Sequence, residues 1–195
     1  MRTIFPTVIH ELKVENFKSL KNRLVQFVYE EQKRDPEGVC LSNMGGWQSL
    51  PKYNTYDNIL SSTIRETIVP YFKNNVINEE HQVRCDGVWI NINKKGDRND
   101  SHNHPNCHLA GVFWIKCPKE GGILRFQSPH SYTSGPEMMV YTSKFREKTN
   151  CYPDYWFTPI EGNILIFPAH LNHKVTPHTF DEDRISASFN LSFIL

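Results

Sequence analysis

The spacing of apolar residues divides the chain into a helical first part and a strand-rich second part. From Asn16, apolar residues recur at the interval of one helix face. The segment Asp35-Pro36-Glu37-Gly38 is expected to end this first helix. A second pattern of this kind begins at Tyr56. It is expected to stop near Pro70, because proline interrupts the hydrogen-bond ladder of a helix. We expect both helices to cover one face of a sheet.

Beyond about residue 81 the apolar period becomes that of β-strands. Val88–Asn93 alternates as a strand does, and Lys94–Asp97 supplies a turn. Further short runs are rich in β-branched and aromatic residues and are separated by glycine and proline: Leu109–Ile115, Ile123–Phe126, Asn163–Phe167 and Ile185–Ile194. Helices followed by many short strands predict a β-sandwich or jelly roll with an N-terminal helical cover.

The segment SNMGGWQSLPKYN, between the two predicted helices, is expected to be irregular because of its glycines and proline. Its Trp47 has two interpretations: it caps the mouth of a site as part of a lid, or it packs into the core. The chain contains no linker and no internal repeat. We therefore predict a single domain over 1–195, in which 1–80 form the helical cover and loop and 81–195 form the jelly-roll core.

Composition narrows the possible partners and compartments. The formal net charge is +1, which gives no electrostatic case for nucleic acid or an anionic membrane as partner. The N-terminus has no signal-peptide pattern and no apolar run has the length of a membrane helix, so we expect a soluble, cytoplasmic protein. The five cysteines are widely spaced without a C-x-x-C pair, which argues against disulfides or structural zinc.

Histidines supply the first candidate chemistry. His102 and His104 stand two residues apart, a spacing that brings both side chains to the same side of a strand. His173 follows a glycine turn at Gly162, an apolar strand and Pro168, and is the natural third member. Three ligands on one face leave coordination positions open for substrate and O₂, as non-haem Fe(II) oxygenases require. The alternative for any one histidine is a surface or hydrogen-bonded core residue.

A second candidate lies at the start of the last predicted strand. Arg184 and Ser186 share one strand face, and a guanidinium beside a hydroxyl suits a carboxylate ligand. The alternative partner for Arg184 is an acid of the preceding loop, Asp181, Glu182 or Asp183.

Three segments, SHNHPNCHLAGVFWI, GNILIFPAHLNHKVTP and RISASFNL, together resemble the 2-oxoglutarate/Fe(II)-dependent oxygenase superfamily. More narrowly, they look like a family of such oxygenases found in bacterial and phage genomes. The resemblance covers roughly residues 85–195, and the GGWQS segment also fits it. It implies a double-stranded β-helix, a jelly roll of the cupin-like type that is mainly β with N-terminal helices.

The resemblance also implies roles for individual residues. His102 and His173 would be iron ligands, and Arg184, helped by Ser186, would bind the distal carboxylate of 2-oxoglutarate. The implied cofactors are Fe(II) and 2-oxoglutarate, and the implied enzyme is a dioxygenase, expected to hydroxylate a small molecule or a protein residue. The sequence identifies neither the substrate nor the oligomeric state.

One position departs from the superfamily pattern, because His104 stands where Asp or Glu is usual. It has three interpretations. His104 is itself the third ligand; or it points elsewhere and solvent or another anion fills the gap; or Asp97 or Asp100 swings in from the preceding turn. We favour the first, since His104 occupies the ligand position of the pair.

Two rival classes share these patterns. A three-histidine, cupin-like metal dioxygenase, such as a thiol dioxygenase, would not use 2-oxoglutarate, and a non-catalytic jelly-roll binding module would have kept only a vestigial site. The Arg184-x-Ser186 pair favours the oxygenase. Around the site, we expect Asn91 and His108 to line the cofactor pocket, and the strands that carry Phe113, Trp114 and Arg125 to neighbour it. His170 and His178 are expected to be solvated, and Arg125 to be ion-paired or at the surface.

Overall fold

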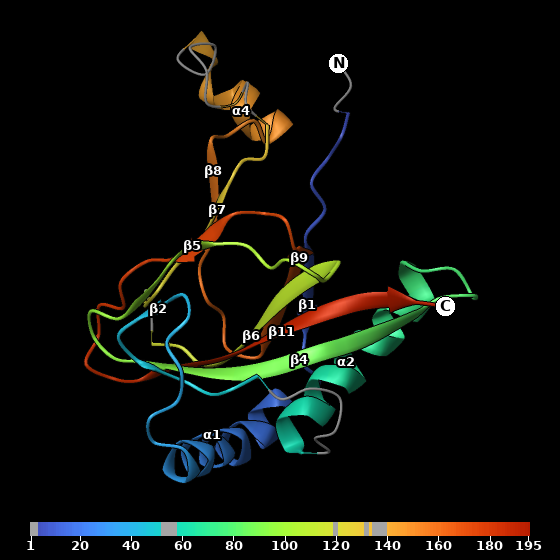
Figure 1. Cartoon of the computed structure of the whole chain (residues 1–195). Helices are drawn as coiled ribbons and strands as arrows, with labels where there is room; N and C mark the ends of the chain where they lie inside the picture. Colours follow the sequence, from blue (N-terminus) through green and yellow to red (C-terminus); the bar gives the residue numbers. More distant parts are fainter. Residues whose placement is uncertain (1–3, 52–57, 119–120, 131–132, 134–139) are drawn as a thin grey trace.

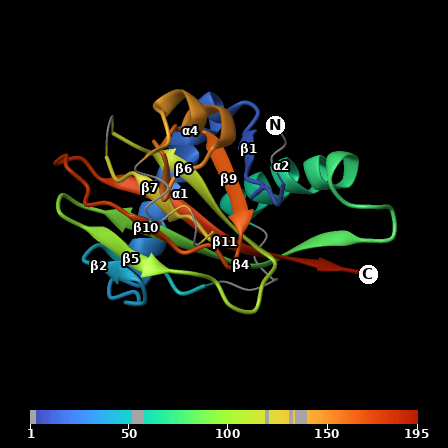
Figure 2. The same cartoon turned by 90° about the horizontal axis from the view of Figure 1, so that it is seen from above.

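The computed structural model describes residues 4–51, 58–118, 121–130, 133 and 140–195. Within them, two antiparallel sheets lie one over the other as a double-stranded β-helix (Figure 2). The six-stranded sheet has the order β1-β9-β6-β11-β4-β3, and the five-stranded sheet the order β2-β5-β10-β7-β8. The predicted fold class is confirmed.

The strands of the six-stranded sheet include the longest in the molecule. They are β1 (His10–Lys13), β3 (Trp47–Gln48), β4 (Gln82–Asn93), β6 (Leu109–Lys116), β9 (Asn163–Pro168) and β11 (Arg184–Ile194). The last strand, β11, lies between β4 and β6 and pairs with both over most of its length. The predicted strands at 88–93, 109–115, 163–167 and 185–194 correspond to β4, β6, β9 and β11.

The strands of the five-stranded sheet are shorter. They are β2 (Asn43–Met44), β5 (Arg98–His102), β7 (Leu124–Gln127), β8 (Asp154–Phe157) and β10 (His173–Val175). The β7–β8 pair and the short helix α4 (Ser143–Thr149) project away from the two layers (Figure 1). This sheet forms the second wall of the cavity described below.

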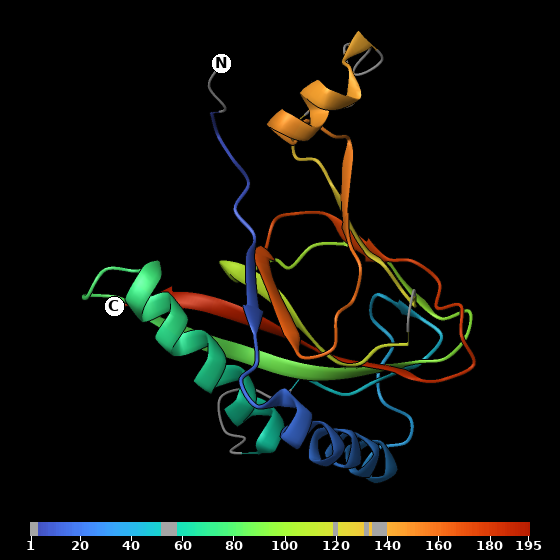
Figure 3. The same ribbon diagram turned by 180° about the vertical axis from the view of Figure 1, so that it is seen from behind.

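Two long helices, α1 (Phe17–Arg34) and α2 (Ile59–Asn75), cover the outer face of the six-stranded sheet (Figures 1 and 3). Buried side chains from both helices and from one face of the sheet form a common core. Burial of this apolar area stabilises the layer contact, at about 25 cal/mol per Å² removed from water. The helices therefore fix the sheet from behind and leave its other face to the second sheet.

The prediction that the second helix stops near Pro70 is wrong, because α2 continues to Asn75. Pro70 lacks an N–H and so removes one hydrogen bond from the ladder. Its side of the helix is exposed, while Ile68 and Phe72, on the buried side, are 1% and 0% exposed. Packing of these two residues outweighs the cost of the missing bond.

Trp47 is a core residue rather than part of a lid. Its side chain is 7% exposed, and its Nε1 donates a hydrogen bond to the carbonyl of Asp35, 2.8 Å away. The tryptophan thereby joins the loop after α1 to strand β4, to which β3 is paired. Among the helices of the described segments, none is long and apolar enough to cross a membrane.

Candidate metal and cofactor site

Three histidines converge between the two sheets. His102 ends β5 and His173 begins β10, and the two residues are direct partners in the antiparallel ladder. His104 lies beyond the end of β5, where its backbone N–H donates to the carbonyl of Ala169 at 2.9 Å. The convergence of His102 and His104 therefore arises from a tethered loop, and not from a shared strand face as the spacing predicted.

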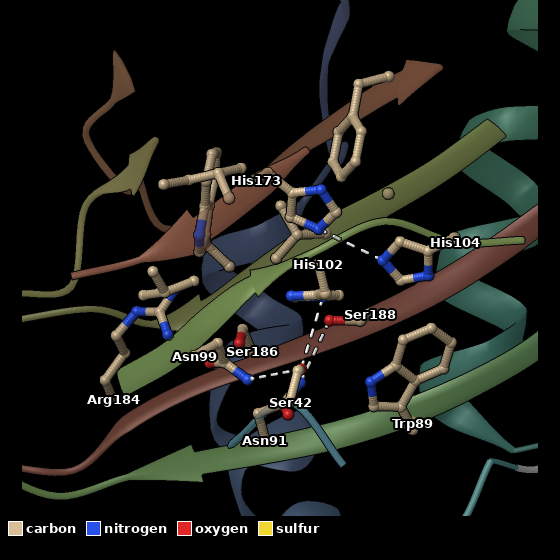
Figure 4. Close-up of a pocket in the computed structure, with 16 residues that line it drawn as sticks. Ser42, Trp89, Asn91, Asn99, His102, His104, His173, Arg184, Ser186 and Ser188 are labelled. Carbon is tan, nitrogen blue, oxygen red and sulfur yellow. Dashed lines mark hydrogen bonds between the residues drawn. The ribbon is translucent and has the colours of Figure 1, made fainter. Parts of the chain in front are cut away.

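The three side chains present nitrogens to one point. One ligand atom from each of His102, His104 and His173 lies within 4.8 Å of the other two, and Nε2 of His104 is 3.3 Å from Nε2 of His173. Two imidazole nitrogens bound at about 2.1 Å and at right angles would lie about 3.0 Å apart. The rings turn toward a common centre in Figure 4, so the group has the arrangement of a metal site.

Hydrogen bonds to the backbone fix two of these rings. Nδ1 of His102 donates to the carbonyl of Asp100 at 2.7 Å, and Nδ1 of His173 donates to the carbonyl of Leu171 at 2.8 Å. A proton on Nδ1 leaves the lone pair of Nε2 available, and Nε2 of His102 also lies 3.5 Å from Oγ of Ser42. Such partners set the tautomer and the orientation of a metal-binding histidine.

Burial keeps the cluster uncharged. It lowers the pKa of His104 to about 4 and that of His173 to about 3, with a further lowering from the neighbouring His102 in each case. Burial also lowers the pKa of His102. At neutral pH all three imidazoles are neutral, with one nitrogen free of a proton, which is the form that binds a metal ion.

The two nearby carboxylates are engaged elsewhere. Asp100 makes an ion pair with Arg98 at 3.1 Å, and Oδ2 of Asp97 accepts the backbone N–H of Lys94 at 2.6 Å. Neither belongs to the group of converging ligand atoms. Of the three interpretations of the sequence, this geometry favours His104 itself as the third ligand.

Strand β11 brings a buried cation into the same cavity. Arg184 is 2% exposed, and the one hydrogen bond of its side chain within the described residues runs from Nη1 to Oδ1 of Asn93 at 3.2 Å. Its Nε is buried without a partner. Burial lowers the pKa of Arg184, yet a guanidinium stays charged in a protein, so it requires a counter-ion.

The acids of the preceding loop do not meet this requirement. Asp181 pairs with Lys95 at 3.0 Å, and Asp183 accepts the hydroxyl of Tyr29 at 2.8 Å. The backbone carbonyl of Glu182 holds Nε2 of His178. No ion pair joins Arg184 to a protein acid in the described part of the chain, so the alternative assignment of Arg184 to a loop salt bridge is not what the structure shows.

A row of polar groups runs across three strands beside Arg184. Ser186 on β11 lies opposite Asn91 on β4 and opposite Trp114 on β6. All three are buried and line the cavity (Figure 4 labels Asn91 and Ser186). Nε1 of Trp114 and Oδ1 of Asn91 have no hydrogen-bond partner within the described residues. Buried groups of this kind require a partner, which a bound polar ligand would supply.

Two predicted residues lie elsewhere. His108 is exposed, its Nδ1 accepts the backbone N–H of Phe193 at 3.2 Å, and it does not line the cavity, so we remove it from the candidate set. His178, expected to be solvated, is 2% exposed because it packs against Gly121 and anchors the loop before Arg184. The surface ion pair expected for Arg125 is present, with Asp154 at 2.5 Å.

A wider groove opens beside the histidines. It has a volume of about 470 Å³ and shares Ser42, Trp89, His102 and His104 with the cofactor cavity. Its other walls were not predictable from the sequence, because they come from segments distant in the chain. Those walls include Leu41, Met44, Gln48, Asp100, Asn103, Pro105 and Asn190.

Comparison with known proteins decides the family. The sequence profile of the family described as "Putative 2OG-Fe(II) oxygenase" matches residues 87–190, which is more than half of the chain. The chain belongs to this family. No curated protein sequence matches this oxygenase significantly.

Solved structures agree with this oxygenase at the level of the fold. A 2OG-Fe(II) oxygenase family oxidoreductase from Burkholderia pseudomallei has a TM-score of 0.59 at 12% identity, over 86% of this chain and 78% of that one. The collagen prolyl hydroxylase of Paramecium bursaria Chlorella virus-1, solved with 2OG, scores 0.56 at 12% identity over 94% of both chains. A prolyl hydroxylase from Trichoplax adhaerens scores 0.62 at 10% identity, over 94% and 83%.

The residues present fit the two cofactors that this family uses, Fe(II) and 2-oxoglutarate. Three neutral imidazoles converge on one point, and imidazole is a suitable ligand for iron. Arg184, with its partnerless Nε, lines the same cavity and offers a buried cation to a carboxylate. The enzyme is therefore a 2-oxoglutarate- and Fe(II)-dependent oxygenase, and its site has three candidate histidine ligands.

Proposed function

We propose that this oxygenase is a hydroxylase that holds Fe(II) with His102, His104 and His173 and binds the distal carboxylate of 2-oxoglutarate with Arg184 and Ser186. One observation carries the assignment of residues. Arg184 is a fully buried cation without an acidic partner in the described chain, and it lines the same cavity as the three histidines. A dicarboxylate that spans this cavity could bind the metal at the histidines with one end and pair with Arg184 at the other.

Each side chain has a separate task. The histidines present three neutral nitrogens on one side, which leaves the opposite positions open for the keto acid and O₂. Arg184 and the hydroxyl of Ser186 bind a carboxylate, and Nε1 of Trp114 offers a further donor beside them. When bound, Fe(II) with 2-oxoglutarate supplies an O₂-dependent oxidation that yields succinate and CO₂.

The groove beside His102 and His104 is the proposed entrance for the substrate. Arg184 and Ser186 line the cofactor cavity and do not line this groove, so substrate and cofactor would have separate spaces. Among the described residues that line this groove, Asp100 is the one charged side chain, and it is paired with Arg98. Several related folds belong to proteins named as prolyl hydroxylases, which supports hydroxylation as the reaction.

The test is anaerobic titration of the Fe(II)-loaded protein with 2-oxoglutarate, followed by the weak visible absorption band that arises when a keto acid chelates iron. In the native protein this band should saturate as 2-oxoglutarate is added. Arg184→Met, which keeps the volume but removes the charge, should weaken binding on the order of 100-fold, since a buried charge partner is lost. Arg125→Met, a matched change at a half-buried surface ion pair, should bind as the native protein does.

The reaction is tested separately by O₂-dependent formation of succinate. Stoichiometric iron without an absorption band and without succinate would overturn the proposal. O₂ consumption with a thiol under those same conditions would favour the three-histidine dioxygenase in its place.

A further inference from the structure

The third histidine of the cluster differs from the other two in its support. His102 and His173 each donate Nδ1–H to a backbone carbonyl. No backbone carbonyl accepts a hydrogen bond from the ring of His104 in the described part of the chain, and its Nε2 faces His173. A ring with Nε2 at a metal carries its proton on Nδ1 and needs an acceptor there.

Asn190 stands where that acceptor is needed. It lies on the face of β11 that also carries Arg184, Ser186 and Ser188, because side chains alternate along a strand. Its neighbours across the ladders are small, Gly87 on β4 and Ala110 on β6. Asn190 and His104 line the same groove.

A contact between the two side chains identifies the atom. The side chain of Asn190 lies within hydrogen-bonding reach of the ring of His104. Nε2 of this ring faces His173, so the nitrogen left for Asn190 is Nδ1, and the acceptor of asparagine is Oδ1. That Oδ1 is buried and makes no hydrogen bond of good geometry within the described residues, so it is available to His104.

Trp89 limits the remaining freedom of the ring. Its indole stacks on His104 with a centroid distance of 5.7 Å and an interplanar angle of 27°. The stack restricts rotation of the ring out of its plane, while an acceptor at Nδ1 would fix rotation within the plane. Together they would replace the rigid backbone support of the other two histidines.

We propose that Asn190 is a positioning residue: its Oδ1 accepts the Nδ1–H of His104 and thereby holds Nε2 of His104 at the metal. The inference rests on the proposed three-histidine centre. It adds that the ligand in the place of the usual carboxylate depends on a side chain, whereas the other two depend on the main chain. Asn190→Leu removes the acceptor and keeps the branched shape of the side chain, and Asn190→Asp keeps an acceptor.

The experiment uses the Co(II)-substituted full chain. Proton NMR should show three paramagnetically shifted, solvent-exchangeable signals, one from the Nδ1–H of each coordinated histidine. In Asn190→Leu one of the three should exchange faster or disappear, and metal affinity should fall about 10- to 100-fold, as for other partners of metal-binding histidines. Asn190→Asp should keep three signals with one displaced. Asn172→Leu, at an exposed position beside His173, is the matched control and should match the native protein.

The outcomes test the role of Asn190 and the three-histidine centre separately. Three unchanged signals and native affinity in Asn190→Leu would overturn the role of Asn190. If the leucine variant does not fold, the aspartate variant decides, because a carboxylate bonded to Nδ1–H must move that signal. Two signals in the native protein, with a metal affinity that His104→Ala leaves unchanged, would instead show that His104 is not a ligand, so the three-histidine centre itself would fail.

Discussion

At the scale of single residues, Gly122 and Arg184 form a close pair that explains how a buried cation fits beside a turn. Gly122 has φ +60°, and a Cβ at this position would lie 3.0 Å from both Cδ and Nε of Arg184. The guanidinium therefore lies against bare backbone. A side chain here would press on the residue proposed to hold the carboxylate.

We predict that Gly122→Ala weakens 2-oxoglutarate binding several-fold, because the added methyl displaces Arg184. Gly96→Ala is the matched control: Gly96 also has a positive φ, +90°, but a Cβ added there would meet no atom within 4 Å, so both variants carry a backbone cost of about 1 kcal/mol. Calorimetric titration of both loaded proteins measures the difference. Equal affinities in the two variants would contradict the role assigned to the contact.

The sequence identified the residues that carry recognisable chemistry. His102, His104, His173 and the Arg184-x-Ser186 pair were candidates from side-chain type and spacing, and the structure brings all five residues to one cavity. Phe113 and Trp114 were both placed near the cavity, but Phe113 packs in the core with the helices and Trp114 lines the cavity. The partnerless N–H of Trp114 depends on the register of three strands. Asn190 gave no signal, since an isolated asparagine in a strand is compatible with many environments.

At the scale of elements, the side chains of β11 alternate strictly between an apolar face and a polar face. Ile185, Ala187 and Phe189 are all 0% exposed and face the helical layer, whereas the residues between them face the cavity. The ring of Phe189 packs against Gly111 of β6, where a Cβ would lie 2.2 Å from it. The apolar face fixes the strand, and the polar face is positioned as a result.

Phe189→Ala should lower the free energy of unfolding by about 3–5 kcal/mol, because the removed ring leaves a cavity in a packed core. Phe180→Ala, at a side chain that is 38% exposed, should change it by less than about 1 kcal/mol. Urea unfolding of the metal-free proteins gives both values. Similar midpoints for the two variants would mean that the core collapses around position 189.

The long strands were predictable, and so was the short strand β7, which matches the predicted run Ile123–Phe126, but the other short strands were not. β4, β6, β9 and β11 have continuous apolar patterns, so their existence and type followed from the sequence. β1, at His10–Lys13, escaped prediction because its stability comes from pairing with β9. β10 has three residues, too few for a periodic pattern, although it carries His173.

At the scale of the whole molecule, the charge state of the metal site is linked to folding. The folded pKa values of His104 and His173, about 4 and about 3, lie below the ordinary value of 6.5 that applies to the unfolded chain. Between these values the unfolded state binds more protons than the folded state. Stability therefore decreases as pH falls from about 6.5 toward 4.

The metal-free protein should accordingly have a lower urea midpoint at pH 5 than at pH 7.5. A His104→Gln, His173→Gln double variant should lose less over the same interval, since two of the groups responsible no longer titrate. If its midpoint falls as steeply as that of the native protein, ionisable groups outside the cluster control the acid sensitivity. Adding a divalent metal at pH 7.5 should raise the native midpoint, because it binds only the folded form.

The alternation of β11 also restricts how this gene can diverge. Individual positions between Arg184 and Asn190 can change one at a time and affect either the core or the cavity. The insertion or deletion of one residue there would exchange the two faces, turning the cofactor anchor toward the helices and an isoleucine or phenylalanine toward the iron. We therefore expect relatives to preserve the length of this segment even where its composition differs, and to place their insertions in the connecting loops.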